Sequence, residues 1–138
     1  MNLSIRRICP GAFSLLVSLA ACAADVPVSE NHPLDGSRFQ GQTGEQGKGN
    51  HHEDTITFED GRFRSLDCEN WGFGPAPYSA WTEGDAYRFA ATLHSDDRGT
   101  LDWTGTIRDD TAEATFRWIH ERWYWSIDRS YWFKGKRQ

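Results

Sequence analysis

Cysteine is scarce in this sequence of 138 residues, with only three, at positions 9, 22 and 68. Cys9 belongs to an amino-terminal leader described below, and Cys22 is a predicted lipid-attachment site, so Cys68 has no partner for a disulfide bond. A fold held together by disulfide bonds is therefore excluded. Because Cys-x-x-Cys and His-x-x-x-His spacings are also absent, we expect neither a metal ion nor another cofactor.

Motifs of nucleophilic catalysis and nucleotide binding are missing as well. The sequence contains no Gly-x-Ser-x-Gly, no Walker loop and no Gly-x-Gly-x-x-Gly, so it predicts a protein that is not an enzyme. The chain has room for one domain, because domains commonly contain about 100–150 residues. Its formal net charge of −5 argues against a general nucleic-acid-binding protein.

The sequence has one long apolar run, Ile8–Ala21, which spans 14 residues. A membrane-spanning helix needs roughly 20. The run follows Arg6 and Arg7 and precedes small residues, which is the pattern of a secretory signal peptide. Residues 1–21 are therefore predicted to be a leader, and no later segment is apolar enough to span a bilayer.

The end of the leader, Leu19-Ala20-Ala21-Cys22, resembles the bacterial lipobox, in which the cysteine is lipidated and begins the mature chain. The thiol would carry the diacylglycerol, and small residues would fit the peptidase. Ala23 in place of an aspartate favours the outer membrane, facing the periplasm or the surface, by resemblance to enterobacterial sorting. Ordinary cleavage at Ala21-Cys22-Ala23 is the alternative, and it would give a soluble periplasmic or secreted protein.

Residues 22–33 are predicted to be a tether, because they contain prolines and acidic residues and few large apolar groups. The folded domain is predicted to span residues 34–138. Without the leader the chain has 13 basic and 20 acidic residues, a net charge of −7, whereas residues 117–138 carry a net charge of +4. In an acidic envelope protein, this basic segment suits contact with the phosphates of anionic lipid or lipopolysaccharide better than contact with nucleic acid. The alternative is a charged last strand exposed to solvent.

What the mature chain has in abundance is alternation of polar and apolar residues. A period of two is typical of strands with one buried face, and no segment shows a convincing helical period. The predicted strands cover residues 38–42, 55–59, 62–65, 87–93, 100–107, 112–118, 123–127 and 131–133. Asp60-Gly61 between two of them is the strongest hairpin signal, and it places Ile56, Phe58 and Phe63 on one face.

The segments between these strands are predicted to be loops. Residues 41–54 are rich in glycine, glutamine, asparagine and histidine, and residues 67–77 contain several glycines and prolines. Strands spaced about every 8–12 residues indicate an antiparallel sandwich or a closed barrel. An all-β, up-and-down barrel of about eight short strands fits the length best, because closure leaves no exposed edge; a β-sandwich is the alternative.

Aromatic residues are abundant, at 14%, and all seven tryptophans follow residue 70. Large rings fill the interior of a small barrel, or they line a cavity for one small ligand. The segment Trp123-Tyr124-Trp125, within a predicted strand, places rings on both faces, so one face covers something other than the main core.

Two groups of polar residues are candidate sites. His51 and His52, with Glu53 and Asp54, are predicted to lie on a surface loop, because nothing fixes further metal ligands beside them. Cys68 is either a buried, inert thiol or a reactive one. Its neighbours Asp67 and Glu69 should raise its pKa, which weakens the second interpretation.

Two stretches, Leu34-Asp35-Gly36-x-x-Phe39 and Phe58-x-x-Gly61-x-Phe63-x-Ser65-x-x-Cys68-x-x-x-Gly72-Phe73-x-x-x-x-Tyr78, resemble small proteobacterial envelope lipoproteins with a lipocalin-like (calycin-type) β-barrel. The resemblance covers residues 34–135 in layout, and residues 58–78 are its most specific part. It implies a barrel and an envelope location, and no catalytic residue. Small lipoprotein lysozyme inhibitors share the lipobox and the barrel size, but this chain lacks their paired cysteines.

The leading prediction is a non-enzymatic envelope lipoprotein, held to the membrane through its lipid, that binds a small apolar or amphipathic ligand. The residues predicted to bind the ligand are Gly72, Phe73, Tyr78 and Trp81 in a loop at the barrel mouth, with Phe89 and Trp103 inside. One alternative is a protein-interaction module, such as an inhibitor of a hydrolase, that meets an envelope protein through the last strands. Another is a redox or haem protein that depends on Cys68.

Overall fold

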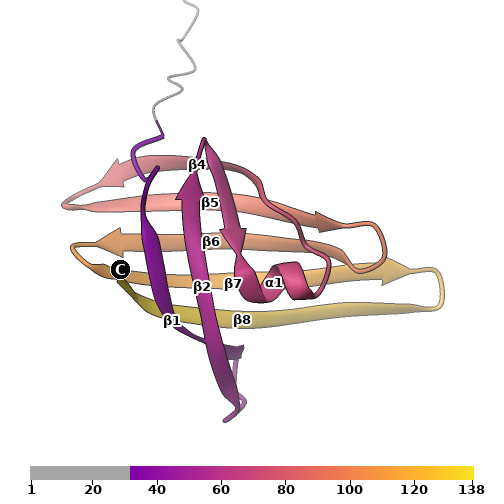
Figure 1. Cartoon of the computed structure of the whole chain (residues 1–138). Helices are drawn as coiled ribbons and strands as arrows, with labels where there is room; N and C mark the ends of the chain where they lie inside the picture. The colour runs from indigo at the N-terminus through magenta and orange to yellow at the C-terminus, as the bar shows by residue number, and fades with distance from the viewer. Residues whose placement is uncertain (1–31) are drawn as a thin grey trace, which may run out of the picture.

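The computed structural model describes residues 32–138, which are almost entirely β-structure (Figure 1). The predicted leader (1–21), the lipidation site Cys22 and most of the tether lie outside the described residues. Among residues 32–138, no helix is long and apolar enough to cross a membrane. The elements are β1 (Arg38–Glu45), β2 (His51–Glu59), β3 (Arg62–Ser65), α1 (Leu66–Asn70), β4 (Ala76–Glu83), β5 (Ala86–Ser95), β6 (Gly99–Arg108), β7 (Thr111–Arg122) and β8 (Trp125–Arg137).

Each strand pairs antiparallel with the next one in the chain, and the first strand pairs with the last. The closing pair sets Phe39–Glu45 of β1 opposite Tyr131–Arg137 of β8. The domain is therefore a closed up-and-down barrel of eight strands, as predicted, and not a β-sandwich.

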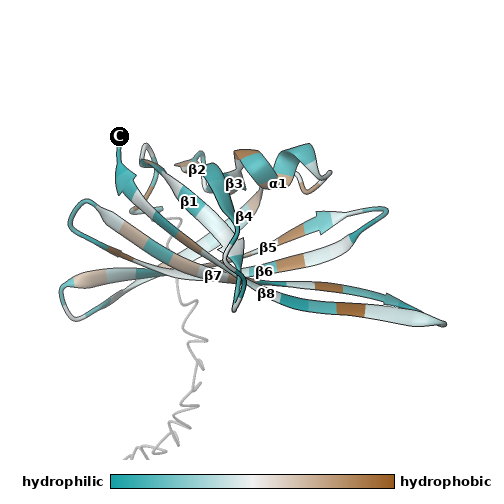
Figure 2. Ribbon diagram, turned by 90° about the horizontal axis from the view of Figure 1, so that it is seen from below, coloured by the Kyte–Doolittle hydropathy of each residue, from teal (hydrophilic) through white to brown (hydrophobic). Residues whose placement is uncertain are grey.

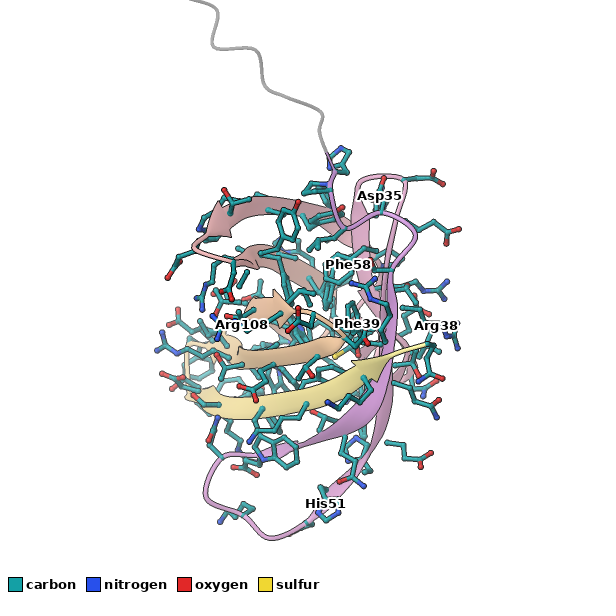
Figure 3. All side chains as sticks on the ribbon, turned by 90° about the vertical axis from the view of Figure 1, so that its left-hand side faces the viewer. Asp35, Arg38, Phe39, His51, Phe58 and Arg108 are labelled. Atoms are coloured by element: carbon teal, nitrogen blue, oxygen red, sulfur yellow. The ribbon has the colours of Figure 1, made fainter. Side chains whose placement is uncertain are left out.

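Because successive strands run in opposite directions, the connections gather at two ends of the barrel. One end, called the cavity end because a cavity described below lies there, consists of α1 with the loop that follows it and of the β1–β2, β5–β6 and β7–β8 turns. The closed end consists of residues 32–37 and the β2–β3, β4–β5 and β6–β7 turns. Figure 3 shows Asp35 and His51 at these opposite ends of the β1–β2 hairpin.

The hairpin predicted around Asp60-Gly61 is confirmed. Asp60 has φ 51° and Gly61 has φ 72°, the left-handed conformation that a tight turn between β2 and β3 requires. Ile56, Phe58 and Phe63 point inward and are completely buried. The alternation of polar and apolar residues along the strands is visible in Figure 2.

The prediction of a loop over residues 41–54 is wrong. Strand β1 continues to Glu45 and β2 begins at His51, with Gly41 opposite Asp54 and Gly44 opposite His51. This segment has little intrinsic preference for a strand. It is extended because β1 pairs on both sides, with β2 and with β8, so its backbone hydrogen bonds outweigh its composition.

Two further segments differ from the sequence-based expectation. Strand β4 was not predicted, because Pro75 and Pro77 flank its start; the pairing there is brief, with only Arg62–Pro77 and Phe63–Ala76 opposed, so a missing N–H is tolerated. Trp123 and Tyr124 do not lie in a strand but form the turn between β7 and β8. The prediction that they place rings on both faces of a strand is therefore wrong.

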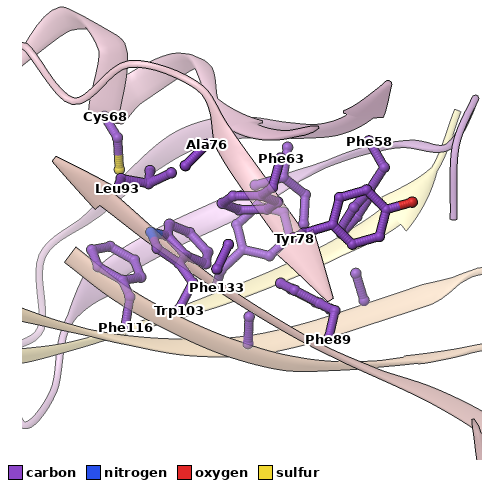
Figure 4. Packing of buried hydrophobic residues seen from close by; sticks show 14 of the residues in the cluster. Phe58, Phe63, Cys68, Ala76, Tyr78, Phe89, Leu93, Trp103, Phe116 and Phe133 are labelled. Carbon is purple, nitrogen blue, oxygen red and sulfur yellow. The ribbon is translucent and has the colours of Figure 1, made fainter. Parts of the chain in front are cut away.

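Aromatic rings fill most of the barrel interior (Figure 4). Phe58 packs edge-on against Tyr78 and Phe89, with ring centroids 4.9 Å apart in each pair. Phe63 contacts Trp103 at 5.0 Å. These residues are almost completely buried and form the core, whereas Trp103 alone of the seven tryptophans is buried.

Candidate functional site

The interior is not filled near the cavity end, where an apolar cavity of about 200 Å³ remains. It lies between α1, the loop after it and the inward faces of β6, β7 and β8. Most of its lining is aromatic or aliphatic, with polar groups from β1, β2, α1 and the β5–β6 turn. The lining residues are Thr43, His52, Asp67, Cys68, Trp71, Phe73, Arg98, Leu101, Phe116, Trp118 and Tyr131.

A stack of three rings separates this cavity from the packed core. Trp103 lies parallel to Phe116, with centroids 4.1 Å apart and planes at 13°, and Phe116 lies parallel to Tyr131 at 5.0 Å and 9°. Phe116 and Tyr131 face the cavity, and Trp103 lies behind them. The buried Trp103 Nε1 has no hydrogen-bond partner within the described residues. Figure 4 shows this nitrogen on the side of the ring toward Phe116.

A buried carboxylate holds α1 in place beside the cavity. Ser65 caps the helix by accepting a hydrogen bond from the Cys68 N–H at 3.1 Å, and its own hydroxyl donates to Asp54 Oδ2 at 2.6 Å. The Asp67 N–H donates to Asp54 Oδ1 at 2.9 Å. Burial is the largest cause that raises the pKa of Asp54 above its ordinary value. Asp54 of β2 thus positions a helix too short to be stable by itself.

An ion pair and a histidine–carboxylate contact at the helix surface reinforce this placement. Arg64 of β3 holds Glu69 with two hydrogen bonds, of 2.7 and 2.6 Å. His52 Nε2 of β2 lies 2.7 Å from Asp67 Oδ2 at the rim of the cavity. Both acidic residues lie in the first turn of the helix, where the helix dipole favours negative charge.

The mouth of the cavity is bordered by a cation–π contact between its two sides. Arg98, in the β5–β6 turn, places its guanidinium 5.3 Å from the centre of the Trp71 ring, which follows α1. The Arg98 carbonyl accepts a hydrogen bond from Trp118 Nε1 at 2.7 Å. Both contacts lie at the surface, so we expect them to open more easily than the packed core.

Cys68 lines the cavity from the buried side of α1. Burial raises the pKa of its thiol to about 12, and Asp54, Asp67 and Glu69 add to the effect. The rise in the pKa agrees with the sequence-based expectation, but burial contributes more to it than the neighbouring carboxylates do. At neutral pH the group is a protonated thiol, which is a weak nucleophile and part of an apolar wall.

The residues predicted to bind a ligand lie in three places. Phe73 is buried and lines the cavity, and Gly72 precedes it in the loop after α1. Phe89 and Trp103 lie inside the barrel but do not line the cavity. The other two residues, Tyr78 and Trp81, lie in β4 and not in a mouth loop.

Neither residue in β4 approaches the cavity. The Tyr78 hydroxyl donates to Asp35 Oδ1 at 2.8 Å at the closed end, and burial together with this hydrogen bond raises its pKa. The Trp81 side chain lies on the outside of the barrel, 45% exposed. Asp35 also accepts a hydrogen bond from the Gly61 N–H, so the Leu34-Asp35-Gly36 segment seals the end opposite the cavity.

The histidine cluster of the sequence does not converge on a site. His51 and His52 are adjacent residues of one strand, so their side chains point to opposite faces. His51 lies near Trp132, with centroids 6.4 Å apart, whereas His52 contacts Asp67. Among residues 32–138, no three His, Cys, Asp or Glu side chains are grouped so that they could hold a metal ion.

Several cavity residues were not singled out from the sequence. Leu101, Phe116 and Trp118 were assigned to strands, but their place along the strand, near the cavity end, decides whether they line a cavity or fill the core. Asp54 does not line the cavity, and its role in holding α1 was not predicted because it was expected on a surface loop beside His51 and His52. One available signal was Ser65 followed by Asp67 and Glu69, the pattern of a helix start.

No protein-family model, no curated protein and no solved structure matches this chain.

Proposed function

We propose that this protein binds one small, mainly apolar ligand in the cavity beside α1, as a carrier or sensor and not as an enzyme. The cavity of about 200 Å³, in a barrel otherwise packed with rings, is the observation that supports this most directly. Apolar cavities of about 150 Å³ can hold a benzene molecule. A ligand with a single aromatic ring or a short acyl chain fits this volume.

The polar groups at the mouth suit an amphipathic ligand. Arg98 and His52 line the cavity as exposed residues, whereas Phe73, Leu101 and Phe116 line it as buried ones. An apolar body would lie among these rings, while a polar or anionic end would meet the arginine. The pattern of an apolar pocket with a few polar groups is typical of small-molecule sites.

The alternative of a redox or haem protein dependent on Cys68 gains little support from this geometry. A thiol with a pKa near 12 is protonated at neutral pH, whereas redox chemistry and iron ligation use the thiolate. Pockets for large ligands commonly have volumes of about 300–1,000 Å³. The cavity of about 200 Å³ is smaller, which also weakens the haem alternative.

We also propose that the domain acts in the cell envelope as an outer-membrane lipoprotein, held through a lipid on Cys22. The support is the sequence alone: the charged and apolar leader, the lipobox-like Leu19-Ala20-Ala21-Cys22 and the proline-containing tether. A small-ligand carrier placed there would act on compounds that cross or leave the membrane.

Calorimetric titration of a chain beginning at Asp25, which retains every strand, tests the binding proposal. The probes are indole, phenol and short-chain fatty acids. We expect saturable binding of at least one probe, weakened at least tenfold by Trp118→Ala, which removes one wall. Trp81→Ala removes the same side chain from the outside of the barrel and should leave the affinity unchanged. Absence of saturable heat with every probe, or equal affinities of the two variants, would contradict the proposal.

A further inference from the structure

The part of the β7–β8 hairpin beyond the barrel forms a projecting arm, residues 120–127. The last pairing of β7 with β6 is at Ile119, and the last pairing of β8 with β1 is at Tyr131. Within residues 32–138, the Ser130 carbonyl still accepts a hydrogen bond from the Gln46 N–H, but residues 120–127 pair only with each other, for example Arg122 with Trp125. At about 3.4 Å per residue, the tip extends roughly 14 Å beyond Ile119, the last residue of β7 that pairs with β6. Figure 1 shows the arm protruding from the barrel.

The tip of this arm is aromatic, although nothing in the fold requires it to be. Trp123 is 94% exposed and Tyr124 is 63% exposed, and both occupy a two-residue turn where glycine, asparagine or aspartate is usual. They pack only edge-on against each other and Trp125, at 4.9 and 6.0 Å. Large exposed apolar side chains gathered at one place usually mark an interaction site.

The arm is also amphipathic. Cross-strand pairs Arg122–Trp125, His120–Ile127 and Trp118–Arg129 share the face that continues inward to the cavity. The opposite face carries Glu121–Ser126, with an ion pair between Arg117 and Asp128. One face thus combines tryptophan with arginine, and the other is polar.

We propose that this arm docks onto a lipid bilayer, with Trp123, Tyr124 and Trp125 in the interfacial region and Arg122 at the level of the headgroup phosphates. Tryptophan and tyrosine favour this depth, because one part of the ring is apolar and the other forms hydrogen bonds. Arginine can extend its charge toward the phosphates while its stem stays in the apolar layer.

The shape of the arm favours a bilayer over a protein partner. A stable protein interface covers about 800 Å² on each partner. Three aromatic side chains of at most about 250 Å² each, two of them only partly exposed, fall short of that area. A convex tip needs no matching pocket to enter a lipid interface. The proposal concerns the surface of the arm and does not depend on a ligand in the cavity.

Depth-dependent quenching of tryptophan fluorescence tests the proposal. A chain beginning at Asp25, with an amino-terminal hexahistidine tag, is held on phosphatidylcholine–phosphatidylglycerol vesicles by a nickel-chelating lipid. The acyl chains of the vesicles are brominated near the headgroup in one sample and unlabelled in the other. The tag keeps the chain near the surface through the closed end, and the readout reports whether the arm, at the other end of the barrel, reaches and enters the bilayer.

We expect quenching of the wild-type chain by the brominated lipid, and loss of at least half of it in the double variant Trp123→Ser, Tyr124→Ser. Trp81→Ser, which removes an exposed tryptophan from β4, should keep the wild-type quenching. Near-ultraviolet circular dichroism checks that the core around Trp103 is intact in each variant. Equal quenching of the wild-type chain and the double variant would overturn the proposal.

Discussion

Asp54 is the residue that connects the strand framework to the helix beside the cavity. Its carboxylate accepts hydrogen bonds from the Ser65 hydroxyl and from the N–H groups of Thr55 and Asp67. A carboxylate with a pKa raised by burial remains protonated to a higher pH in the folded chain than in the unfolded chain. Its contribution to stability is therefore present at low pH and is lost as the pH rises through the folded-state pKa.

The variant Asp54→Asn should remove this pH dependence. Asparagine can keep an acceptor for the two N–H groups and has no proton to lose. We expect the melting temperature of the wild type, relative to that of the variant, to fall as the pH rises from about 4 to about 7. Thermal unfolding followed by circular dichroism at several pH values measures this difference. Parallel curves for the two proteins would show that Asp54 does not titrate differently on folding.

For single residues, the sequence predicted which side chains are buried better than it predicted where along the barrel they lie. Phe73 lies in the loop after α1 and lines the cavity, and Phe89 and Trp103 lie inside the barrel. Tyr78 and Trp81 were misplaced because the prolines before them suggested a loop, whereas pairing with β5 makes β4 a strand. Alternation shows which side chains point inward, but it does not show how far along the barrel a cavity lies.

The elements that local chemistry determines are those that the sequence predicted best. The β2–β3 hairpin follows from Asp60-Gly61, whose two residues accept the required positive φ. The helix α1, with only five residues, has no local pattern strong enough to predict it; it exists because Ser65, Asp54 and Arg64 hold it.

The substitution Gly61→Ala should destabilise the domain, because alanine resists the left-handed conformation that Gly61 adopts, φ 72°. The expected loss in the free energy of unfolding is about 1–2 kcal/mol. Gly49→Ala is the matched control, since Gly49 has no atom within 4 Å of an added Cβ and does not have a positive φ. Urea denaturation measures both. A control that loses as much stability as Gly61→Ala would refute this account of the turn.

For the whole molecule, barrel closure depends on a contact between two glycines. Gly41 of β1 lies opposite Gly135 of β8. A Cβ added at Gly41 would collide with the backbone of β8, at the Lys134 carbonyl oxygen and Gly135 Cα. Composition suggested a loop around Gly41, so the sequence predicted a closed barrel from strand number and spacing without indicating where the first and last strands meet.

The variant Gly41→Ala should therefore lose much more stability than a glycine variant whose added Cβ has open space. The obstruction is backbone, which cannot move unless the two strands separate, so we expect a loss of about 3 kcal/mol, at the upper end of the range for overpacking. Gly74→Ala, where an added Cβ meets no atom within 4 Å, serves as the comparison. Equal denaturation midpoints for the two variants would mean that the pairing of β1 with β8 tolerates a side chain at Gly41.

The closing pair also has a consequence for synthesis of the chain. Every other strand pairs with its neighbour in sequence, whereas Phe39 pairs with Arg137, near the far end of the described chain. Hairpins of neighbouring strands can form within microseconds, but a contact between distant residues forms slowly and late. While the chain is being made or exported, the inward rings of β1 and β7 stay exposed until β8 emerges. A nascent chain without β8 should therefore need protection from aggregation, and folding should be complete only after the last strand is released.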